Sequence, residues 1–302
     1  MKTTMAGQRI PLRNKIESGY NIFKAHRGRD FSNAAYEVGY HRDLIGYRAT
    51  YVETPLAQAR ILDLGCGQTA TQTALFHADG AKVTGIDVEI ATYAMGLRTF
   101  VRTLRRHGRE RAFKSLARHV LFDRRFFHDL SKEYGRPISF KNLDVRIMDA
   151  TAMDFADSTF DFIDSNAVFE HMNDVPAAVR EMNRVLKPGG LAVVTPHLFP
   201  SLSGGHNLEW RRPDAQAAKN VEPWDHLRKN RHRVAAYMNG LKLSEYREHF
   251  HAAMDVIDEQ LVVEGERHLT PELEAELGAK GYTREDLLTR TVTFLARKKA
   301  AS

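Results

Sequence analysis

The sequence has very little cysteine and no long apolar run. Cys66 is the one cysteine among 302 residues, which excludes an internal disulfide and a metal site built from several thiolates. No stretch of about eighteen apolar residues occurs, so we expect no membrane span. The opening residues, MKTTMAGQRIPLRNK, lack the apolar segment of a secretory signal. These absences predict a cytoplasmic protein in a reducing compartment.

The sequence also lacks a strong excess of charge of either sign. It has 44 basic and 38 acidic residues, for a net charge of +6. This modest excess is compatible with anionic partners but does not demand nucleic acid. With 43% hydrophobic residues, no internal repeat and no linker-like stretch, we expect one domain over residues 1–302.

A strand, two glycines and a helix are predicted in succession near residue 65. The apolar run at 61–64 predicts a buried strand that stops at Gly65 and Gly67, where the backbone must turn tightly and admit close contact. Apolar spacing then predicts a helix over 69–78. About twenty residues on, a second apolar strand ends in Asp87, where a carboxylate can accept both hydroxyls of a ribose. The pattern indicates a nucleotide-type binding turn.

Two families are compatible with this turn. Gly65, Gly67 and Ala70 satisfy G-x-G-x-x-G/A, which allows an NAD(P)-dependent oxidoreductase. With Asp63 included, however, the string DLGCG resembles motif I of the class I S-adenosylmethionine-dependent methyltransferases. A third glycine often follows in that family, and Thr69 takes its place here.

The resemblance to this methyltransferase family, of small-molecule type, extends over roughly residues 60–195. Its second half contains, in order, the strings FDFIDS (160–165), EH (170–171) and VLKPGG (185–190), followed by an apolar strand at 191–195. The resemblance implies an α/β fold with a Rossmann-like, mostly parallel seven-stranded sheet and helices on both faces. Two closing strands near 254–263 and 290–296 complete that sheet, with a helix starting at Thr270-Pro271 between them.

The resemblance implies S-adenosylmethionine as the cofactor and assigns residues to it. The acid at Asp63 helps to hold the amino-acid end, and an acid beyond the third strand accepts from the adenine amine. Asn166 would form the wall opposite the sulfonium. The full set of expected cofactor residues is Asp63, Gly65, Cys66, Gly67, Asp87, Val88, Asp149, Ala150 and Asn166.

Two further segments are expected to flank this core. Residues 1–59 predict an N-terminal helical cap, from which Tyr36, Tyr40 and Arg42 would reach the ligand or, alternatively, pack the cap onto the sheet. Residues 91–140 predict an inserted basic helical hairpin, because arginines there alternate with apolar residues at helical spacing. This hairpin is either a solvated basic face or a wall that recognises an anionic acceptor or another protein.

The irregular stretch 199–240 is predicted to be a substrate lid, with His206 and Trp210 as candidate contacts. The alternative is a surface insertion that its tryptophans anchor. His171 is the candidate catalytic base, unless its Glu-His pair only orders the loop. His197, His206 and His226 are further candidate bases or ligands, but no tight ligand spacing supports a metal and none is assigned.

These patterns together predict a small-molecule methyltransferase, acting on oxygen, with a specialised metabolite or glycan precursor as acceptor. An RNA methyltransferase is a competing interpretation, but a proline–aromatic motif is absent after the fourth strand, which reads DSNA (164–167). The NAD(P)-dependent oxidoreductase and a non-catalytic binding module also stay compatible with the sequence. The oligomeric state stays open, a homo-oligomer included.

Overall fold

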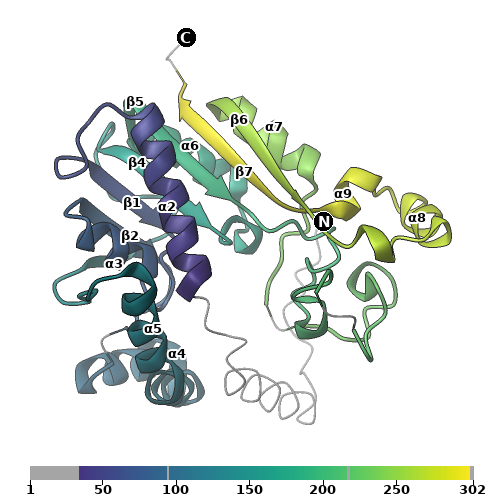
Figure 1. Ribbon diagram of the computed structural model, residues 1–302, viewed down its shortest axis with the longest axis horizontal. Coiled ribbons are helices and arrows are strands. Elements are labelled where there is room, and N and C mark those ends of the chain that lie inside the picture. Colours follow the sequence, from purple (N-terminus) through teal and green to yellow (C-terminus); the bar gives the residue numbers. More distant parts are fainter. Residues whose placement is uncertain (1–33, 94, 216–217, 235, 300–302) are drawn as a thin grey trace.

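A computed structural model describes residues 34–93, 95–215, 218–234 and 236–299 (Figure 1). The first 33 residues of the expected cap, and residues 216, 217 and 235 of the expected lid, lie outside this range. Among the described helices, none has both the length and the apolar content needed to cross a lipid bilayer.

The core of the described chain is one seven-stranded sheet in the order β3-β2-β1-β4-β5-β7-β6. The first five strands in this order, from β3 across to β5, run parallel, whereas β7 is antiparallel to both of its neighbours, β5 and β6. This confirms the Rossmann-like, mostly parallel sheet. The strands are β1 (Arg60–Leu64), β2 (Lys82–Asp87), β3 (Asp144–Ile147), β4 (Phe160–Asn166), β5 (Leu186–Thr195), β6 (Met254–Val263) and β7 (Thr289–Lys298).

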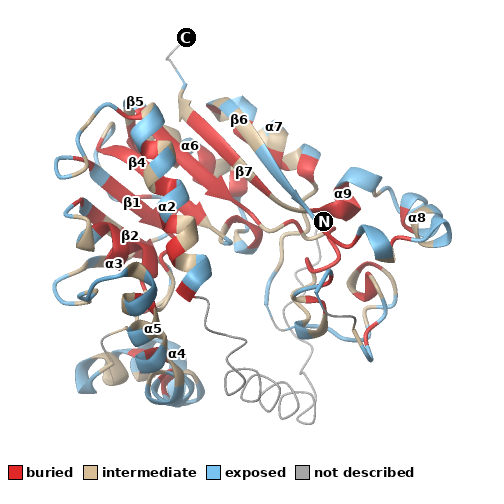
Figure 2. Cartoon of the chain, viewed as in Figure 1, coloured by how far each residue is buried: buried red, intermediate tan, exposed pale blue. Residues whose placement is uncertain are grey.

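Helices cover both faces of the sheet, so the central strands are buried (Figure 2). On one face, Leu44 of α2 (Ala34–Tyr51) and Phe76 of α3 (Thr71–Ala78) pack in one apolar cluster with β1 and β4. On the other face, α6 (Val175–Val185) and α7 (Leu243–Ala253) pack in a second cluster. Strands covered on both sides read as near-continuous apolar runs, which is why the sequence pattern identified them.

The start of β5 differs from the expectation. The helix before LKPGG ends at Val185, as the proline and the paired glycines predict, but the strand was expected to begin only at Leu191. Instead β5 begins at Leu186, which pairs with Phe160, and the register shifts before Leu191 pairs with Phe162. The proline and glycines are accommodated as a bulge on the extended chain, as such residues often are at strand irregularities.

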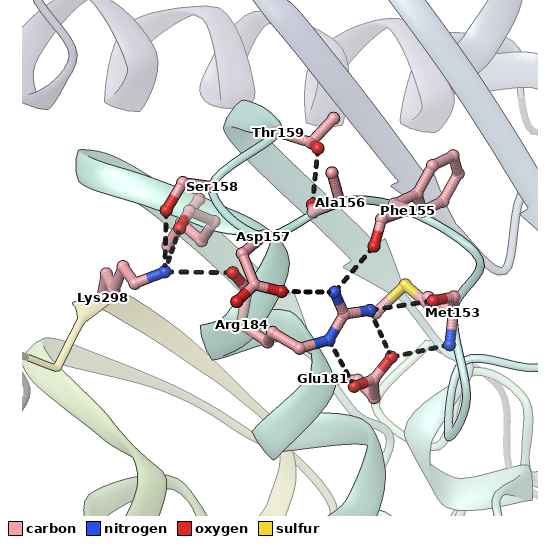
Figure 3. A network of polar contacts seen from close by, with 10 residues as sticks. Met153, Phe155, Ala156, Asp157, Ser158, Thr159, Glu181, Arg184 and Lys298 are labelled. Atoms are coloured by element: carbon pink, nitrogen blue, oxygen red, sulfur yellow. Dashed lines mark hydrogen bonds and ion pairs between the residues drawn. The ribbon is translucent and has the colours of Figure 1, made fainter.

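Arg184 on α6 forms hydrogen bonds with the loop at 153–157 that leads into β4 (Figure 3). Its guanidinium donates to the carboxylates of Glu181 and Asp157 over 2.7–2.8 Å, and to the carbonyls of Phe155 and Met153 over 2.7 and 2.8 Å. Because the guanidinium presents several donors in a fixed plane, one side chain ties the loop, the helix and the strand entry together.

The basic insertion consists of α4 (Leu97–Arg118), a π-helical turn (His119–Asp123) and α5 (Arg124–Tyr134). Gly108, at φ 82°, interrupts α4. The rings of Phe100 and Phe113 lie 5.4 Å apart across this break, whereas thirteen residues of straight helix span about 20 Å. The two arms of α4 therefore fold back on each other at Gly108.

The chain after β5 shares an apolar cluster with the chain between β6 and β7, to the right of the sheet in Figure 1. This cluster includes Trp210 and Trp224, whose indole N–H groups donate to the carbonyls of Glu222 (3.2 Å) and Pro200 (3.1 Å). Both indoles thus stabilise the chain after β5 by packing in this cluster and by hydrogen bonds to its backbone. Its helical elements are η3 (Leu208–Trp210), η4 (Asp225–Leu227), η5 (Glu266–His268), α8 (Pro271–Gly278) and α9 (Arg284–Leu288).

Candidate active site

The glycine loop lies between β1 and α3 at the carboxyl edge of the parallel strands. Gly65 and Gly67 adopt φ values of 79° and 65°, and the amides of Gly65 and Cys66 donate to the carbonyl of Ile86 over 2.8 and 3.0 Å. A Cβ on Gly65 would lie 2.3 Å from the side chain of Val168. Glycine is therefore required at position 65 for both its conformation and its contact. Cys66 is buried, and burial raises the pKa of its thiol, so it stays protonated.

Asp63 is buried beneath this loop and binds the start of α3. Its carboxylate accepts from the amide of Thr73 over 2.8 Å and from the Thr73 hydroxyl over 2.5 Å. Burial raises the pKa of Asp63 to about 7 despite those two hydrogen bonds, and the nearby Asp87 adds to the rise. Asp63, the acid of motif I, thus already accepts a hydrogen bond from a backbone amide near the start of α3.

Asp87 ends β2 beside the glycine loop. One carboxylate oxygen accepts from the amide of Gly67 over 3.0 Å and the other from the amide of Glu89 over 2.7 Å, so the group is held in one orientation. The carbonyl of Asp87 accepts from the amide of Met148 over 3.0 Å, which brings the loop after β3 alongside. Asp149 in that loop is exposed and accepts from the amide and hydroxyl of Thr151.

The other expected cofactor residues near this loop differ in burial. Ala150 is buried directly after Asp149, whereas Val88 is 59% exposed directly after Asp87. The two acids and their neighbours therefore belong to one stretch of the sheet edge, formed by the ends of β2 and β3.

Asp164 on β4 is a second buried acid, aligned with Asp63 on the neighbouring strand. Its Oδ1 is buried without a hydrogen-bond partner in the described part of the chain, and burial followed by the charge of Asp63 raises its pKa well above the usual range. Two residues on, the side-chain amide of Asn166 donates to the hydroxyl of Tyr36 over 3.2 Å. The end of β4 and the start of α2 thus meet just beyond Asp164.

The candidate residues of α2 are placed differently from one another. The rings of Tyr36 and Tyr40 stack at 6.4 Å, and Tyr36 is largely exposed while the hydroxyl of Tyr40 is buried. Arg42 is exposed, and no contact of it with the glycine loop is found in the described chain. Tyr36 forms a hydrogen bond with an expected cofactor residue, Asn166.

The basic insertion contacts the glycine loop region directly. Arg111 of α4 donates to the carboxylate of Glu89, which also accepts from the side-chain Nε2 of Gln68 over 2.6 Å. Arg118 donates to the Oε1 of Gln68 over 3.3 Å. Arginines of the insertion therefore contact the loops that follow β1 and β2.

Histidines gather beyond the ends of β4 and β5. The ring of His206 lies 4.9 Å from that of His197 and 5.3 Å from that of His171, while His226 binds the carbonyl of Phe199 over 2.9 Å. The acidic member of the group is the buried Glu170. By contrast, Trp210 packs inside the apolar cluster, with its ring 5.0 Å from that of His268.

Sequence patterns missed two acids that the fold brings to this edge. Asp164 was treated as part of a strand, although a charged residue in the buried run FDFIDS is itself a signal that a partner is needed. Glu170 was treated only as one half of the Glu-His pair. The contact of Arg111 with Glu89 had no local signal, because the two residues belong to separate segments.

Comparisons with known proteins match the chain to a family model and to a bacterial relative. A family model described as a methyltransferase domain matches residues 36–250. An uncharacterized Escherichia coli (strain K12) protein, YafE, is 43% identical over 60 residues, which is 20% of this chain and 29% of that protein. The chain thus matches less than a third of the length of this relative.

Solved structures with a similar fold share little sequence with the chain. An S-adenosylmethionine-dependent methyltransferase from Methanosarcina mazei is 16% identical, with a TM-score of 0.45 over 84% of this chain and 98% of that one. YcgJ from Bacillus subtilis is 17% identical, with a TM-score of 0.43 over 86% and 100%. Neither likeness carries a functional conclusion.

The family model covers well over half of the chain, from the exposed Tyr36 of α2 to Phe250 of α7. Its span includes the glycine loop and the buried acids. This decides between the two families that the glycine pattern alone allowed. The chain belongs to the methyltransferase-domain family, whose methyl donor is S-adenosylmethionine.

Proposed function

We propose that this protein transfers a methyl group from S-adenosylmethionine to an oxygen atom of a small-molecule acceptor. The observation that carries the proposal is the pair of buried acids, Asp63 and Asp164, next to Asp87 at the carboxyl edge of the sheet. S-adenosylmethionine carries positive charge on its sulfonium and its amino group. The unpartnered Oδ1 of Asp164 fits an ammonium group, which would supply the missing donor.

The same acids argue against a dinucleotide. In an oxidoreductase of this fold, the pyrophosphate would bind the amides at the start of α3. Here the carboxylate of Asp63 already accepts from the amide of Thr73, and Asp87 from that of Gly67. A pyrophosphate would have to displace or lie against these carboxylates, which favours a cationic ligand.

Within this proposal, each polar residue of the edge has a role in holding the cofactor. Asp87 accepts the ribose hydroxyls, because its carboxylate is already oriented by two backbone amides. Asp149 accepts the adenine amine. Asn166 and Tyr36 cover the methionine end from above. The bound cofactor supplies an electrophilic methyl group, and the remaining task of the protein is to align the acceptor with it.

His171 is the proposed base for the acceptor hydroxyl. The Tyr237 carbonyl only accepts, so Nδ1 of neutral His171 donates to it over 2.7 Å. Its Nε2 is then the basic nitrogen. A hydroxyl must lose its proton during methylation, whereas a neutral amine attacks without prior deprotonation. A histidine fixed in this tautomer beside the end of β4 therefore supports oxygen as the methylated atom.

The arginine face of α4 supports an anionic acceptor. Arg98, Arg102, Arg105 and Arg106 follow one another at helical spacing on the first arm. On the second arm, Arg111 and Arg118 already contact the loops after β1 and β2. The first arm thus presents positive charge on an element that is anchored to the cofactor region, where it would attract a carboxylate or phosphate.

The proposal is tested first by calorimetric titration with S-adenosylhomocysteine. We expect saturable binding that weakens at least about tenfold in Asp87→Asn, because a charge-assisted hydrogen bond is lost. The matched control is Asp144→Asn, an exposed aspartate on β3 that pairs with Arg146, and its affinity should equal that of the unchanged protein. Binding of NADH instead of S-adenosylhomocysteine would overturn the assignment.

Acceptor class is tested by transfer of tritiated methyl groups to three pools: hydroxylated small anions, small amines and RNA. We expect transfer to the first pool, with a fall of at least about tenfold in His171→Gln. Transfer to RNA alone, with binding that weakens steeply as salt is raised, would establish a nucleic-acid methyltransferase instead.

A further inference from the structure

Three potential metal ligands converge from separate segments beyond the end of the sheet. Glu170 lies in the short helix η2 (Phe169–His171), His197 follows β5 by two residues, and His206 belongs to the irregular chain after it. One ligand atom from each of the three lies within 4.8 Å of the other two. No local spacing in the sequence joins them.

Two of the three side chains have buried polar atoms without a partner in the described part of the chain. Glu170 is fully buried, and neither of its carboxylate oxygens has a donor in good hydrogen-bond geometry, although the backbone amides of Glu170 and His197 lie nearby; the Nε2 of His206 is buried and unpaired as well. A buried polar group without a partner is costly, and a carboxylate more so than a neutral group. Because these unpaired atoms belong to one cluster, a single cation would suit all of them.

The two histidines are suited to coordinate a metal. Imidazole nitrogens are common ligands of transition-metal ions. The Nε2 of His197 also contacts the hydroxyl of Ser203 over 2.8 Å, which fixes the ring as outer-shell partners do around metal-ligating histidines.

We propose that Glu170, His197 and His206 bind one divalent transition-metal ion. Two imidazoles and one carboxylate are a recurrent donor set for zinc and non-haem iron, whereas magnesium and calcium prefer oxygen ligands alone. Ligand atoms at about 2.1 Å around a tetrahedral ion lie about 3.4 Å apart, so small side-chain rotations close the site. Three protein ligands leave a coordination position open for a water or for an acceptor oxygen.

The charges that face this cluster permit a cation. Arg290 is the nearby fixed positive charge, and it lies 3.7 Å from the carboxylate of Glu264, which offsets it. His171, His226 and Tyr246 are further titratable neighbours of the cluster. The backbone of His206 has φ 54°, a conformation uncommon for residues other than glycine, and next to it a Cβ on Gly205 would lie 2.6 Å from the His226 ring. The chain is thus held so that His206 reaches Glu170 and His197.

The test is a titration of tag-free, chelator-treated protein with Co²⁺, followed by its visible absorption. We expect absorption that saturates at about one equivalent and is displaced by Zn²⁺ but not by Mg²⁺. Glu170→Gln and His206→Gln should each weaken Co²⁺ binding at least about tenfold, the smallest loss expected even for an outer-shell partner. His251→Gln is the control, because His251 is exposed on α7 and pairs with Glu259 instead.

A second readout guards against loss of folding in the variants. Glu170→Gln keeps the shape of the side chain, so it should fold, and circular dichroism checks this. Zn²⁺ should raise the melting temperature of the unchanged protein and of His251→Gln, but not that of Glu170→Gln. No saturable Co²⁺ absorption, or equal binding by Glu170→Gln, would overturn the proposal. Neither readout involves methyl transfer, so failure here leaves the proposed function untouched.

Discussion

Asn166 at the end of β4 donates a hydrogen bond to the hydroxyl of Tyr36 on α2 over 3.2 Å, and the two residues are 130 positions apart in the chain. Asp63 and Asp164 are buried on the neighbouring strands β1 and β4. The bond thus joins the helix before the sheet to the end of β4, two residues beyond Asp164, although neither residue is part of the glycine loop.

Tyr36→Phe should weaken S-adenosylhomocysteine binding by about three- to tenfold, because one hydrogen bond that positions Asn166 is lost. The fold should be unaffected, since Tyr36 is largely exposed. Isothermal calorimetry measures the change. The matched control is Tyr47→Phe on the same helix, whose hydroxyl binds Gln260 on β6. Equal affinities of the two variants would show that the hydrogen bond between Asn166 and Tyr36 does not contribute to cofactor binding.

Asp164→Asn should stabilise the protein more at pH 7.5 than at pH 5. A carboxyl whose pKa is raised by folding stays protonated in the folded state while it ionises in the unfolded state. Its contribution to the free energy of unfolding therefore falls as the pH rises above about 4, which is the pKa of an aspartate in the unfolded state. We expect the effect of the substitution on stability to differ by at least about 1 kcal/mol between the two pH values.

Urea unfolding at both pH values measures this difference. The histidines with lowered pKa values change stability in the opposite sense, but they contribute equally to both proteins and cancel in the comparison. Asp144→Asn is the control: its pKa is lowered by Arg146, so its effect should not change between pH 5 and pH 7.5. An Asp164→Asn effect that is the same at both pH values would contradict the burial of a raised-pKa acid.

Arg184→Ala should lower the free energy of unfolding by about 2–3 kcal/mol, because hydrogen bonds to two carboxylates and two carbonyls are lost together (Figure 3). The exposed Arg180 on the same helix is the control, and Arg180→Ala should change the free energy of unfolding by less than about 0.5 kcal/mol. Chemical denaturation measures both. Similar losses for the two arginines would mean that helix composition, rather than the network, sets the effect.

Arg111→Gln should loosen the basic insertion without unfolding the sheet. Arg111 lies on α4 and its contact with Glu89 ties the insertion to the loop after β2, so amide hydrogen exchange in 97–118 should accelerate. Arg105→Gln, on the first arm of α4, should leave that exchange unchanged. If exchange accelerates equally in both variants, the ion pair with Glu89 does not hold the insertion in place.

Local residue patterns were enough to identify the sheet and the place of the glycine loop. Local sequence marks these features: apolar runs indicate buried strands, Gly65 and Gly67 indicate a tight turn, and Asp87 marks the end of a strand. These signals do not depend on where the rest of the chain packs. The boundaries were predicted less well: β5 begins five residues earlier than expected, because the strand continues through a bulge.

Which side chains meet depends instead on the tertiary structure. Glu170, His197 and His206 come from three segments, and Arg111 reaches Glu89 from a separate insertion. The tryptophan Trp210, expected at the substrate, packs inside an apolar cluster instead, so its role at the acceptor stays a prediction. Such contacts depend on how distant elements pack, and no local pattern of residue types encodes that packing. The strands of the sheet and several acids at their ends could therefore be predicted, whereas the contacts between side chains of separate segments could not.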